Sequence, residues 1–340
     1  MIRMSTILLL SMVAVGCQQP LRPVFPEVSP SREWPPRPDI PRIRYIGELT
    51  GEESLGKPQA WGLKSLLAGP EPQVAFSTPT SVVAHADRVY VADGQNHAVY
   101  ILDIVSRDFR TITGPPQQSF QWPACVTVVD NRIAVADSKG AAVFIFEADG
   151  RFVRTIGTGL LQRPTALAWN PSARQLWVLD TALQACIAFD ADGREMRRVG
   201  RRGESLGEFN YPAGMCWSPQ IGLAVADSMN FRVQLLADDG QPRRMFGRKG
   251  DAAGDFSLPR DVAVDSEGHL YVLDSQFENV QIFDEQGRLL MAWGGEGRGP
   301  GEFYLPSGIF IDEQDRIWVA DTYNRRVQVF QYLRQMQTRE

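Results

Sequence analysis

The side chains that could do acid–base or metal chemistry are few and scattered in this chain. Its three histidines are His85, His97 and His269, and no two of them have the spacing of a metal-binding pair. Each lies in or beside a predicted turn between two strands, where a histidine is usually exposed and structural. We therefore expect no metal, no other cofactor and no catalytic residue.

Motifs for nucleophilic or phosphate chemistry find no support in the sequence either. Residues 203–207 match the letters Gly-x-Ser-x-Gly, but a predicted strand rather than a helix follows them, so they are not a nucleophile elbow. There is no haem-attachment Cys-x-x-Cys-His and no P-loop. Glycine-rich stretches lie at residues 200–209, 247–256 and 294–303. A predicted strand rather than a helix follows each of them, so no helix N-terminus would face a phosphate. We interpret these stretches as connections between repeated units.

A unit that ends in an aspartate repeats six times from residue 76 onward. Each unit has an aromatic residue or Leu, a Pro three residues later, an alternating apolar segment, and a second such segment that ends in Asp. The six aspartates are Asp93, Asp137, Asp180, Asp227, Asp274 and Asp321, at intervals of 43 to 47 residues. Their place before a turn predicts carboxylates that accept backbone N–H bonds. The interval is that of a four-stranded propeller blade.

The last three units carry a family resemblance. Residues 210–218 with 224–240, 257–287 and 304–331, the last reading YLPSGIFIDEQDRIWVADTYNRRVQVFQ, closely resemble NHL repeats. The resemblance covers about residues 76–332 and implies an all-β, six-bladed β-propeller. It also implies that Arg232 and Arg326 pack or pair with a neighbouring blade's turn. The first three units are looser and have Ala98, Ala142 and Ala185 at this position.

The sixth unit is incomplete. It supplies three strands, and residues 333–340 are too polar to form a buried fourth one. Residues 42–48, RIRYIGE, have the form of the fourth strands in other units, such as FVRTIG at 152–157. We expect residues 42–48 to pair outside residues 326–332 and to close the ring with a strand from the other end of the chain.

The first residues predict export and anchoring. Residues 1–16 read as a signal peptide with a positive start and an apolar stretch too short to span a membrane. Residues 14–17, Ala-Val-Gly-Cys, resemble the lipobox of bacterial lipoproteins, in which the cysteine, here Cys17, carries lipid. By resemblance to enterobacterial sorting, Gln18 favours the outer membrane. The alternative is a plain secretory signal, with Cys17 an incidental thiol.

The segment after Cys17 predicts a tether. Residues 17–41 contain eight prolines, a density that disfavours helix and most strand pairing. We expect a semi-rigid spacer that holds a propeller at residues 42–332 clear of the bilayer, with a polar tail at 333–340.

The inner strands of a propeller line its channel, and their starts supply the candidate channel site. Asp261 is the one charged residue at a position that other units fill with small residues: Ser81, Cys125, Ala166, Gly214 and Gly308. We expect Cys186 in the core. Cys125 and Cys216 lie near the starts of inner strands, so a disulfide between them stays open in an oxidising compartment.

The charge pattern distinguishes two faces. The net charge of −5 argues against a nucleic-acid partner. The predicted hairpin turns are acid-rich, whereas the glycine-rich connections and the turns after the aspartates are mixed, with basic residues among acids. If a partner docks, we expect it on this second face, which also surrounds the channel mouth. Its candidate residues are Arg201, Arg202, Arg232, Arg248, Lys249, Arg260, Arg298, Arg325 and Arg326.

These observations support a lipid-anchored, non-enzymatic propeller that binds a protein partner in the bacterial cell envelope. Envelope proteins with similar NHL repeats often accompany multihaem cytochromes and secretion systems, so the resemblance implies an accessory role in such a complex. The alternative is an enzyme of the propeller lyase or lactonase kind, with a site in the central channel around Asp261.

Overall fold

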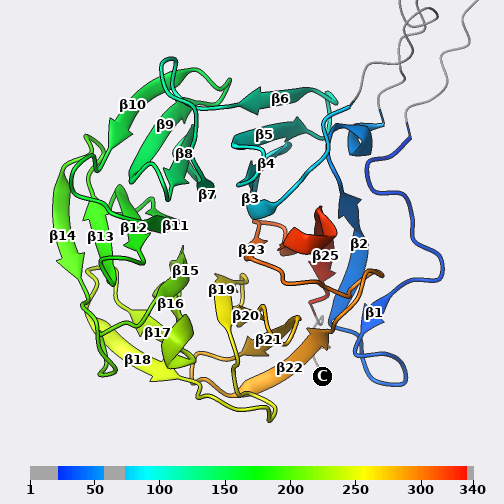
Figure 1. Cartoon of the computed structure of the whole chain (residues 1–340). Coiled ribbons are helices and arrows are strands. Elements are labelled where there is room, and N and C mark those ends of the chain that lie inside the picture. Colours follow the sequence, from blue (N-terminus) through cyan, green and yellow to red (C-terminus); the bar gives the residue numbers. More distant parts are fainter. Residues whose placement is uncertain (1–21, 57–72, 335–340) are drawn as a thin grey trace, which may run out of the picture.

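The alternating apolar segments of the repeat form β-strands, which group into six sheets arranged in a ring (Figure 1). The computed structural model describes residues 22–56 and 73–334. In this part the chain is an all-β, six-bladed β-propeller, which confirms the predicted fold class. Helix is confined to three short 3-10 turns among the described residues: Glu52–Leu55, Ser228–Asn230 and Thr322–Asn324.

Blades one to three each contain four antiparallel strands, which follow one another from the axis outward. Blade one has β3 (Pro79–His85), β4 (Arg88–Asp93), β5 (Ala98–Asp103) and β6 (Phe109–Ile112). Blade two has β7 (Pro123–Val129), β8 (Arg132–Asp137), β9 (Ala142–Glu147) and β10 (Phe152–Ile156). Blade three has β11 (Pro164–Asn170), β12 (Gln175–Asp180), β13 (Ala185–Phe189) and β14 (Glu195–Val199).

Blades four and five follow the same plan, and blade six takes strands from both ends of the chain. Blade four has β15 (Pro212–Ser218), β16 (Gly222–Asp227), β17 (Arg232–Leu236) and β18 (Pro242–Phe246). Blade five has β19 (Pro259–Val264), β20 (Leu270–Asp274), β21 (Asn279–Phe283) and β22 (Leu289–Gly294). Blade six has β23 (Gly308–Ile311), β24 (Arg316–Asp321), β25 (Arg326–Tyr332), β2 (Ile43–Leu49) and β1 (Glu33–Trp34).

The N-terminal strand closes the ring as predicted. β2 pairs antiparallel with β25, from Ile43 opposite Tyr332 to Leu49 opposite Val327. Figure 1 shows β2 from the start of the chain lying along the outside of β25 from its end. The alternation in β2 buries Ile43 and Leu49 completely, and these side chains join the clusters on the two sides of blade six. Closure therefore covers the outer edge that the incomplete sixth unit leaves.

The proline-rich segment before β2 does not stand free, which corrects the predicted tether for its described residues. Phe25 packs edge-on against Trp318 with ring centroids 6.1 Å apart, and Trp34 packs against Phe330 at 5.9 Å. Residues 33–34 also pair with β2. The prolines limit this pairing to two residues, but they leave the apolar side chains between them free to pack on blade six. Cys17 lies outside the described residues.

The core consists of six apolar clusters, each shared by two neighbouring blades. Trp177 of blade three, for example, is fully buried in the same cluster as Leu223 and Leu236 of blade four. Burying one large apolar side chain contributes about 1.5–3 kcal/mol. Because each blade face is covered by the next blade, the free energy of unfolding depends on an unbroken ring.

The six recurring aspartates are structural, as predicted. All are completely buried. Asp180, for example, accepts hydrogen bonds from the backbone N–H groups of residues 162 and 163 and of residues 182 and 183. It thereby joins the start of its inner strand to the turn after its second strand. In blades four and six the aspartate also pairs with an arginine, Arg232 or Arg326, at 2.8 Å.

Hydroxyl groups also join most pairs of neighbouring blades. The residue after the aspartate donates a hydrogen bond to the carbonyl of the next blade's first Pro: Thr181 to Pro212, Ser228 to Pro259, Ser275 to Pro306 and Thr322 to Pro79. In blade one the equivalent residue is Gly94, and Thr80 supplies the hydroxyl to Pro123 at 3.0 Å instead. These bonds fix the starts of the inner strands relative to one another.

Candidate functional site

A cavity of about 730 Å³ lies between the six inner strands. Its lining residues come from the full length of these strands, so it is the central channel. One end lies where the inner strands begin and where each blade connects to the next; we call it the connection end. The other lies where the inner strands run into hairpins; we call it the hairpin end. The volume falls in the range of small-molecule sites, roughly 300–1,000 Å³.

The repeat places four large polar or aromatic side chains at the connection end. Trp122, Arg163 and Tyr211 each precede the Pro that starts an inner strand, and Arg260 follows the Pro of blade five; all four line the cavity. The aspartate of the blade accepts a hydrogen bond from the backbone N–H of Trp122 at 2.8 Å and of Arg163 at 2.9 Å. The landmarks of the repeat therefore hold these residues at the channel rim.

A β-bulge aims Arg260 into the channel. In blade five the pairing of the inner strand shifts by one residue between Pro259 and Asp261, so Arg260 has no partner across the ladder. The same shift occurs in blades one to four, where the extra residues are smaller: Thr80, Ala124, Thr165 and Ala213. Bulges commonly redirect side chains near functional sites.

Arg163 and Arg260 are two cationic side chains that have no ion-pair partner among the described residues. Both side chains are exposed, and neither guanidinium makes a hydrogen bond or an ion pair with another described residue. The protein enclosing Arg260 lowers its pKa, the neighbouring Asp261 carboxylate raises it, and repulsion from Arg163 lowers it further. The two cations are thus close enough to repel each other.

Tyr211 and Trp122 supply aromatic surface on the same rim. The Tyr211 backbone has a φ of 48°, held by a 2.7 Å hydrogen bond from its N–H to the Gln184 side chain, and 49% of the residue is exposed. Positive φ in a bulky residue is strained and is often found at binding sites. The Trp122 ring packs over Gly94, and the Lys139 ammonium lies 4.9 Å from the ring centroid.

Asp261, the predicted channel residue, lies in the channel wall. Its carboxylate accepts hydrogen bonds from the backbone N–H groups of Val262 and Ile309, both at 2.9 Å. A side chain at Gly214 would come within 2.2 Å of it, so the glycine in blade four makes room for this carboxylate. Burial raises the pKa of Asp261 to about 7, against the two N–H bonds and Arg260. Asp261 therefore links blade five to blade six through Ile309.

The hairpin end is acidic, and its lining charges have partners. Asp312 pairs with Arg316 at 2.7 Å and accepts a hydrogen bond from the Trp318 indole at 2.9 Å. Asp130 pairs with Arg174 at 3.1 Å, and Glu313 lies 4.0 Å from the His85 ring. Asp130 and Asp312 are therefore already engaged within the protein.

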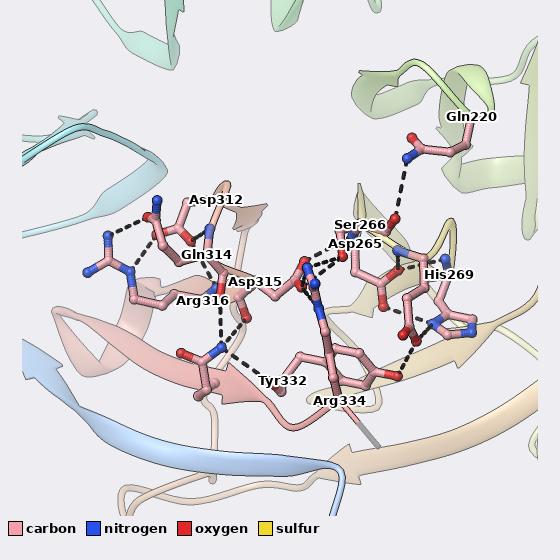
Figure 2. A network of polar contacts seen from close by, with 12 residues as sticks. Gln220, Asp265, Ser266, His269, Asp312, Gln314, Asp315, Arg316, Tyr332 and Arg334 are labelled. Atoms are coloured by element: carbon pink, nitrogen blue, oxygen red, sulfur yellow. Dashed lines mark hydrogen bonds and ion pairs between the residues drawn. The ribbon is translucent and has the colours of Figure 1, made fainter. Parts of the chain in front are cut away.

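Figure 2 shows a polar network beside this end, between the hairpins of blades five and six. The Asp265 carboxylate contacts the His269 ring at 2.8 Å and accepts a hydrogen bond from the Tyr271 hydroxyl at 3.1 Å. Asp315 pairs with Arg334 and accepts a hydrogen bond from the Ser266 hydroxyl at 2.8 Å. The hydrogen bond to Asp265 raises the pKa of His269 although burial opposes it. The network thus joins two blades.

The predicted basic face does not form a single patch. Arg232 and Arg326 are only 6% exposed, and each binds its own blade's aspartate and the carbonyls of the connection before that blade, which excludes them as surface residues. Arg201 pairs with Glu208, Arg248 pairs with Asp255, and Lys249 lies over the Phe231 ring. Arg202, Arg298 and Arg325 are exposed on the connections and turns around the ring. Of the nine residues, Arg260 lines the channel.

Apolar side chains are exposed on the same face. The connections and turns of blades four to six present Leu206, Tyr211, Met229, Tyr304 and Tyr323, each between 39% and 60% exposed. Tyr304 and Tyr323 pack edge to face at 5.4 Å. Tyrosine, methionine and arginine are enriched in protein–protein interfaces.

The histidines and cysteines do not converge. His97 contacts the Gln121 carbonyl at 2.9 Å, and His85 and His269 lie at the hairpin end. Within residues 22–56 and 73–334, no three His, Cys, Asp or Glu side chains are placed to hold a metal ion. The three described cysteines are free, so the disulfide considered between Cys125 and Cys216 does not form. Burial raises the pKa of both Cys125 and Cys186 to about 12.

Sequence reasoning missed Arg163, Trp122 and Tyr211. A signal for them exists, because aligning the units on their Pro places all three at the preceding position, where the other units have Thr78, Leu258 and Leu305. That Arg163 approaches Arg260 follows only from the curvature of the ring, which brings blades three and five to the same channel rim.

Comparison with known proteins supports the fold. Residues 223–337 match the family model DUF5128, described as a 6-bladed beta-propeller. No curated protein matches the chain. A Bacteroides thetaiotaomicron structural genomics protein of unknown function superposes with a TM-score of 0.62 and 16% identity, over 84% of this chain and 75% of that one.

Two further solved structures are similar. An auxiliary nutrient binding protein from Bacteroides thetaiotaomicron has a TM-score of 0.59 and 13% identity, over 76% of this chain and 69% of that one. Virginiamycin B lyase from Staphylococcus aureus has a TM-score of 0.55 and 10% identity, over 76% of this chain and 96% of that one. At these identities the likeness concerns the propeller fold, which hosts unrelated functions.

Proposed function

We propose that this protein is a lipid-anchored binding protein of the bacterial cell envelope, whose propeller docks a protein partner through the connection end. The observation that carries the proposal is the contrast in charge use along the channel. At the connection end Arg163 and Arg260 have no partner among the described residues, whereas Asp130 and Asp312 at the hairpin end are paired with arginines. Because these positive charges are not neutralised within the described part of the protein, they can attract an acidic group of a partner.

The surface around the rim suits a protein. Exposed Tyr211, Tyr304 and Tyr323 combine aromatic area with few rotatable bonds, exposed Met229 adds apolar surface, and Arg202 and Arg298 lie on the connections nearby in sequence. Rigid aromatic anchors flanked by cations are the usual energetic centre of such interfaces. Backbone hydrogen bonds and the clamps made by Arg232 and Arg326 hold the connections in place.

A binding role fits the lining better than a catalytic one. The charged side chains that line the connection end are two arginines and Asp261, whose two oxygens already accept backbone N–H bonds. A lyase or lactonase needs a free base or a metal site near its substrate. Structural neighbours described as auxiliary nutrient binding proteins point in the same direction as the geometry.

The anchor and the family complete the proposal. The lipobox-like residues 14–17 favour attachment through Cys17, and Gln18 favours the outer membrane. No helix in the described part of the chain is long and apolar enough to cross a membrane. The likeness of the last three units to NHL repeats extends the proposal to an accessory role in an envelope electron-transfer or secretion complex.

Site-specific crosslinking in native membranes tests the docking face. A photoreactive residue replaces Tyr211 or Tyr304 at the connection end, or Arg194 as a matched exposed control in a hairpin turn. We expect a discrete adduct from the first two positions and none from Arg194. Equal adducts from both ends, or none from Tyr211 and Tyr304, would contradict the proposal. Cys17→Ser should release the protein from the membrane fraction if the cysteine carries lipid.

A further inference from the structure

We propose that the connection end of the channel is a carboxylate site, in which Arg163 and Arg260 bind one organic carboxylate between them. This inference deepens the proposed function, because it names the chemical group that the connection end recognises. Guanidinium groups match a planar carboxylate with two parallel N–H donors each. Two such groups that have no partner among the described residues and line one cavity offer a pre-formed clamp.

Blade four separates the two arginines around the ring. Arg163 directly precedes the inner strand of blade three, and Arg260 is the second residue of the inner strand of blade five. Blade four has Tyr211 at the position of Arg163, and Ala213 and Gly214 at the positions of Arg260 and Asp261. Gly214 cannot be larger, because a Cβ there would meet the Asp261 carboxylate at 2.2 Å. Between the two arginines blade four therefore presents the Tyr211 ring and two small residues.

Two neighbouring positive charges repel each other and destabilise the folded protein unless an anion binds near them. Burial is the main cause of the lowered pKa of Arg260, and repulsion from Arg163 lowers it further. Two other arginines of this face do have acidic partners, with Arg201 paired to Glu208 and Arg248 paired to Asp255. Uncompensated like charges at one rim fit an anion that arrives from outside.

The surroundings favour a carboxylate on an organic body over a bare inorganic ion. Asp261 lies beside Arg260, so the rim tolerates one added negative charge better than the two of a phosphate dianion. Trp122 and Tyr211 offer ring faces at the rim, and Ala124, Ala166 and Ala213 line the wall below. The cavity, of about 730 Å³, is far larger than an inorganic ion. The ligand is thus a free organic acid or an acidic residue of the docked partner.

Ligand-induced thermal shifts of the purified chain provide the test. The probes are benzoate and glucuronate, their neutral counterparts benzamide and glucose, inorganic phosphate, and a short peptide with a free or an amidated C-terminal carboxylate. The variants are Arg163→Gln, Arg260→Gln and both together, with Arg248→Gln as the control because it removes an exposed arginine of the same face. Titration calorimetry then gives the dissociation constants at low ionic strength.

We expect at least one carboxylate probe to raise Tm and to bind the wild type about tenfold or more tightly than its neutral counterpart. Either single variant should weaken this binding about tenfold or more, Arg248→Gln should leave it unchanged, and the single variants alone should unfold no earlier than the wild type. Equal responses of the wild type and the double variant to every probe would overturn the inference. Phosphate binding as tight as that of the best carboxylate would overturn it too.

The source of the carboxylate is read from the crosslinking experiment repeated with the double variant. Loss of the Tyr211 adduct assigns the group to the partner, and a retained adduct together with lost probe binding assigns it to a free acid. A double variant that keeps full probe binding refutes the carboxylate site, while a normal Tyr211 adduct in that variant leaves the docking role standing.

Discussion

The two ends of the channel use charge in opposite ways. At the hairpin end, acidic side chains such as Asp265, Asp312 and Asp315 bind cations and hydroxyls of their own or the adjoining blade. At the connection end, Arg163 and Arg260 lie in the open channel with no partner among the described residues. The same repeat thus produces one end whose charges stabilise the fold and one whose charges remain available.

The difference shows how to separate structural from functional arginines in a propeller. Arg326 and Arg260 both come from strand positions near the connection end, yet Arg326 is 6% exposed and Arg260 is exposed. Arg326 binds Asp321 and the carbonyls of residues 299 and 302. Availability, rather than charge or position in the repeat, therefore distinguishes a candidate binding residue.

Both ends of the channel depend on one closed ring, and removal of the closing strand disrupts both together. Deleting residues 43–49 exposes the fully buried Val327 and Val329 and leaves β25 as a bare edge. We expect loss of cooperative unfolding, measured by circular dichroism and calorimetry. Trp34→Ala, which removes only outer packing on the same blade, should keep a cooperative transition. Similar behaviour of the two variants would show that β2 does not close the ring.

A second experiment separates the two kinds of arginine on the connection face. Arg326→Ala leaves the buried Asp321 without its cation, and loss of one partner of a buried ion pair costs about 3–5 kcal/mol. Arg298→Ala, on the exposed connection of the same blade, should change the free energy of unfolding by less than about 0.5 kcal/mol. Urea denaturation measures both. A cost for Arg298→Ala as large as that for Arg326→Ala would place the two arginines in the same class.

The smallest expected effects are changes in unfolding free energy with pH, which differ between the two ends of the channel. The pKa of Asp261 is raised from 3.8 to about 7, so the folded protein holds a proton that the unfolded chain releases, and stability falls as pH rises from about 4 to 7. The pKa of His269 is raised above 6.5, so its stabilisation is complete below pH 6.5 and is lost as pH rises through the folded value.

Single substitutions test which end of the channel causes the loss of stability in each of these two pH ranges. Asp261→Asn should flatten the fall in unfolding free energy between about pH 4 and 7, and His269→Gln should flatten the fall above pH 6.5. Denaturant titrations across this range provide the measurement. A wild-type stability that rises with pH throughout would contradict both assignments.

Much of the fold follows from local sequence patterns. The Pro, the alternating segments and the terminal Asp mark each blade, and the missing fourth strand of the sixth unit points to residues 42–48. The packing of Phe25 and Trp34 was not predictable, because proline density describes how a segment can bend and not which apolar surface it meets. Likewise, the sequence places Arg232 and Arg260 in one basic face, while burial separates them.

Sequence periodicity alone specifies the number of blades, the closing strand and the structural role of the six aspartates, because these depend on periodic features that neighbouring residues enforce. Packing in three dimensions determines which charges are free. Whether an arginine meets a carboxylate depends on contacts between segments that are distant in the chain, such as Arg326 with Glu48. The proximity of Arg163 and Arg260 depends in the same way on the closure of the ring around a shared channel.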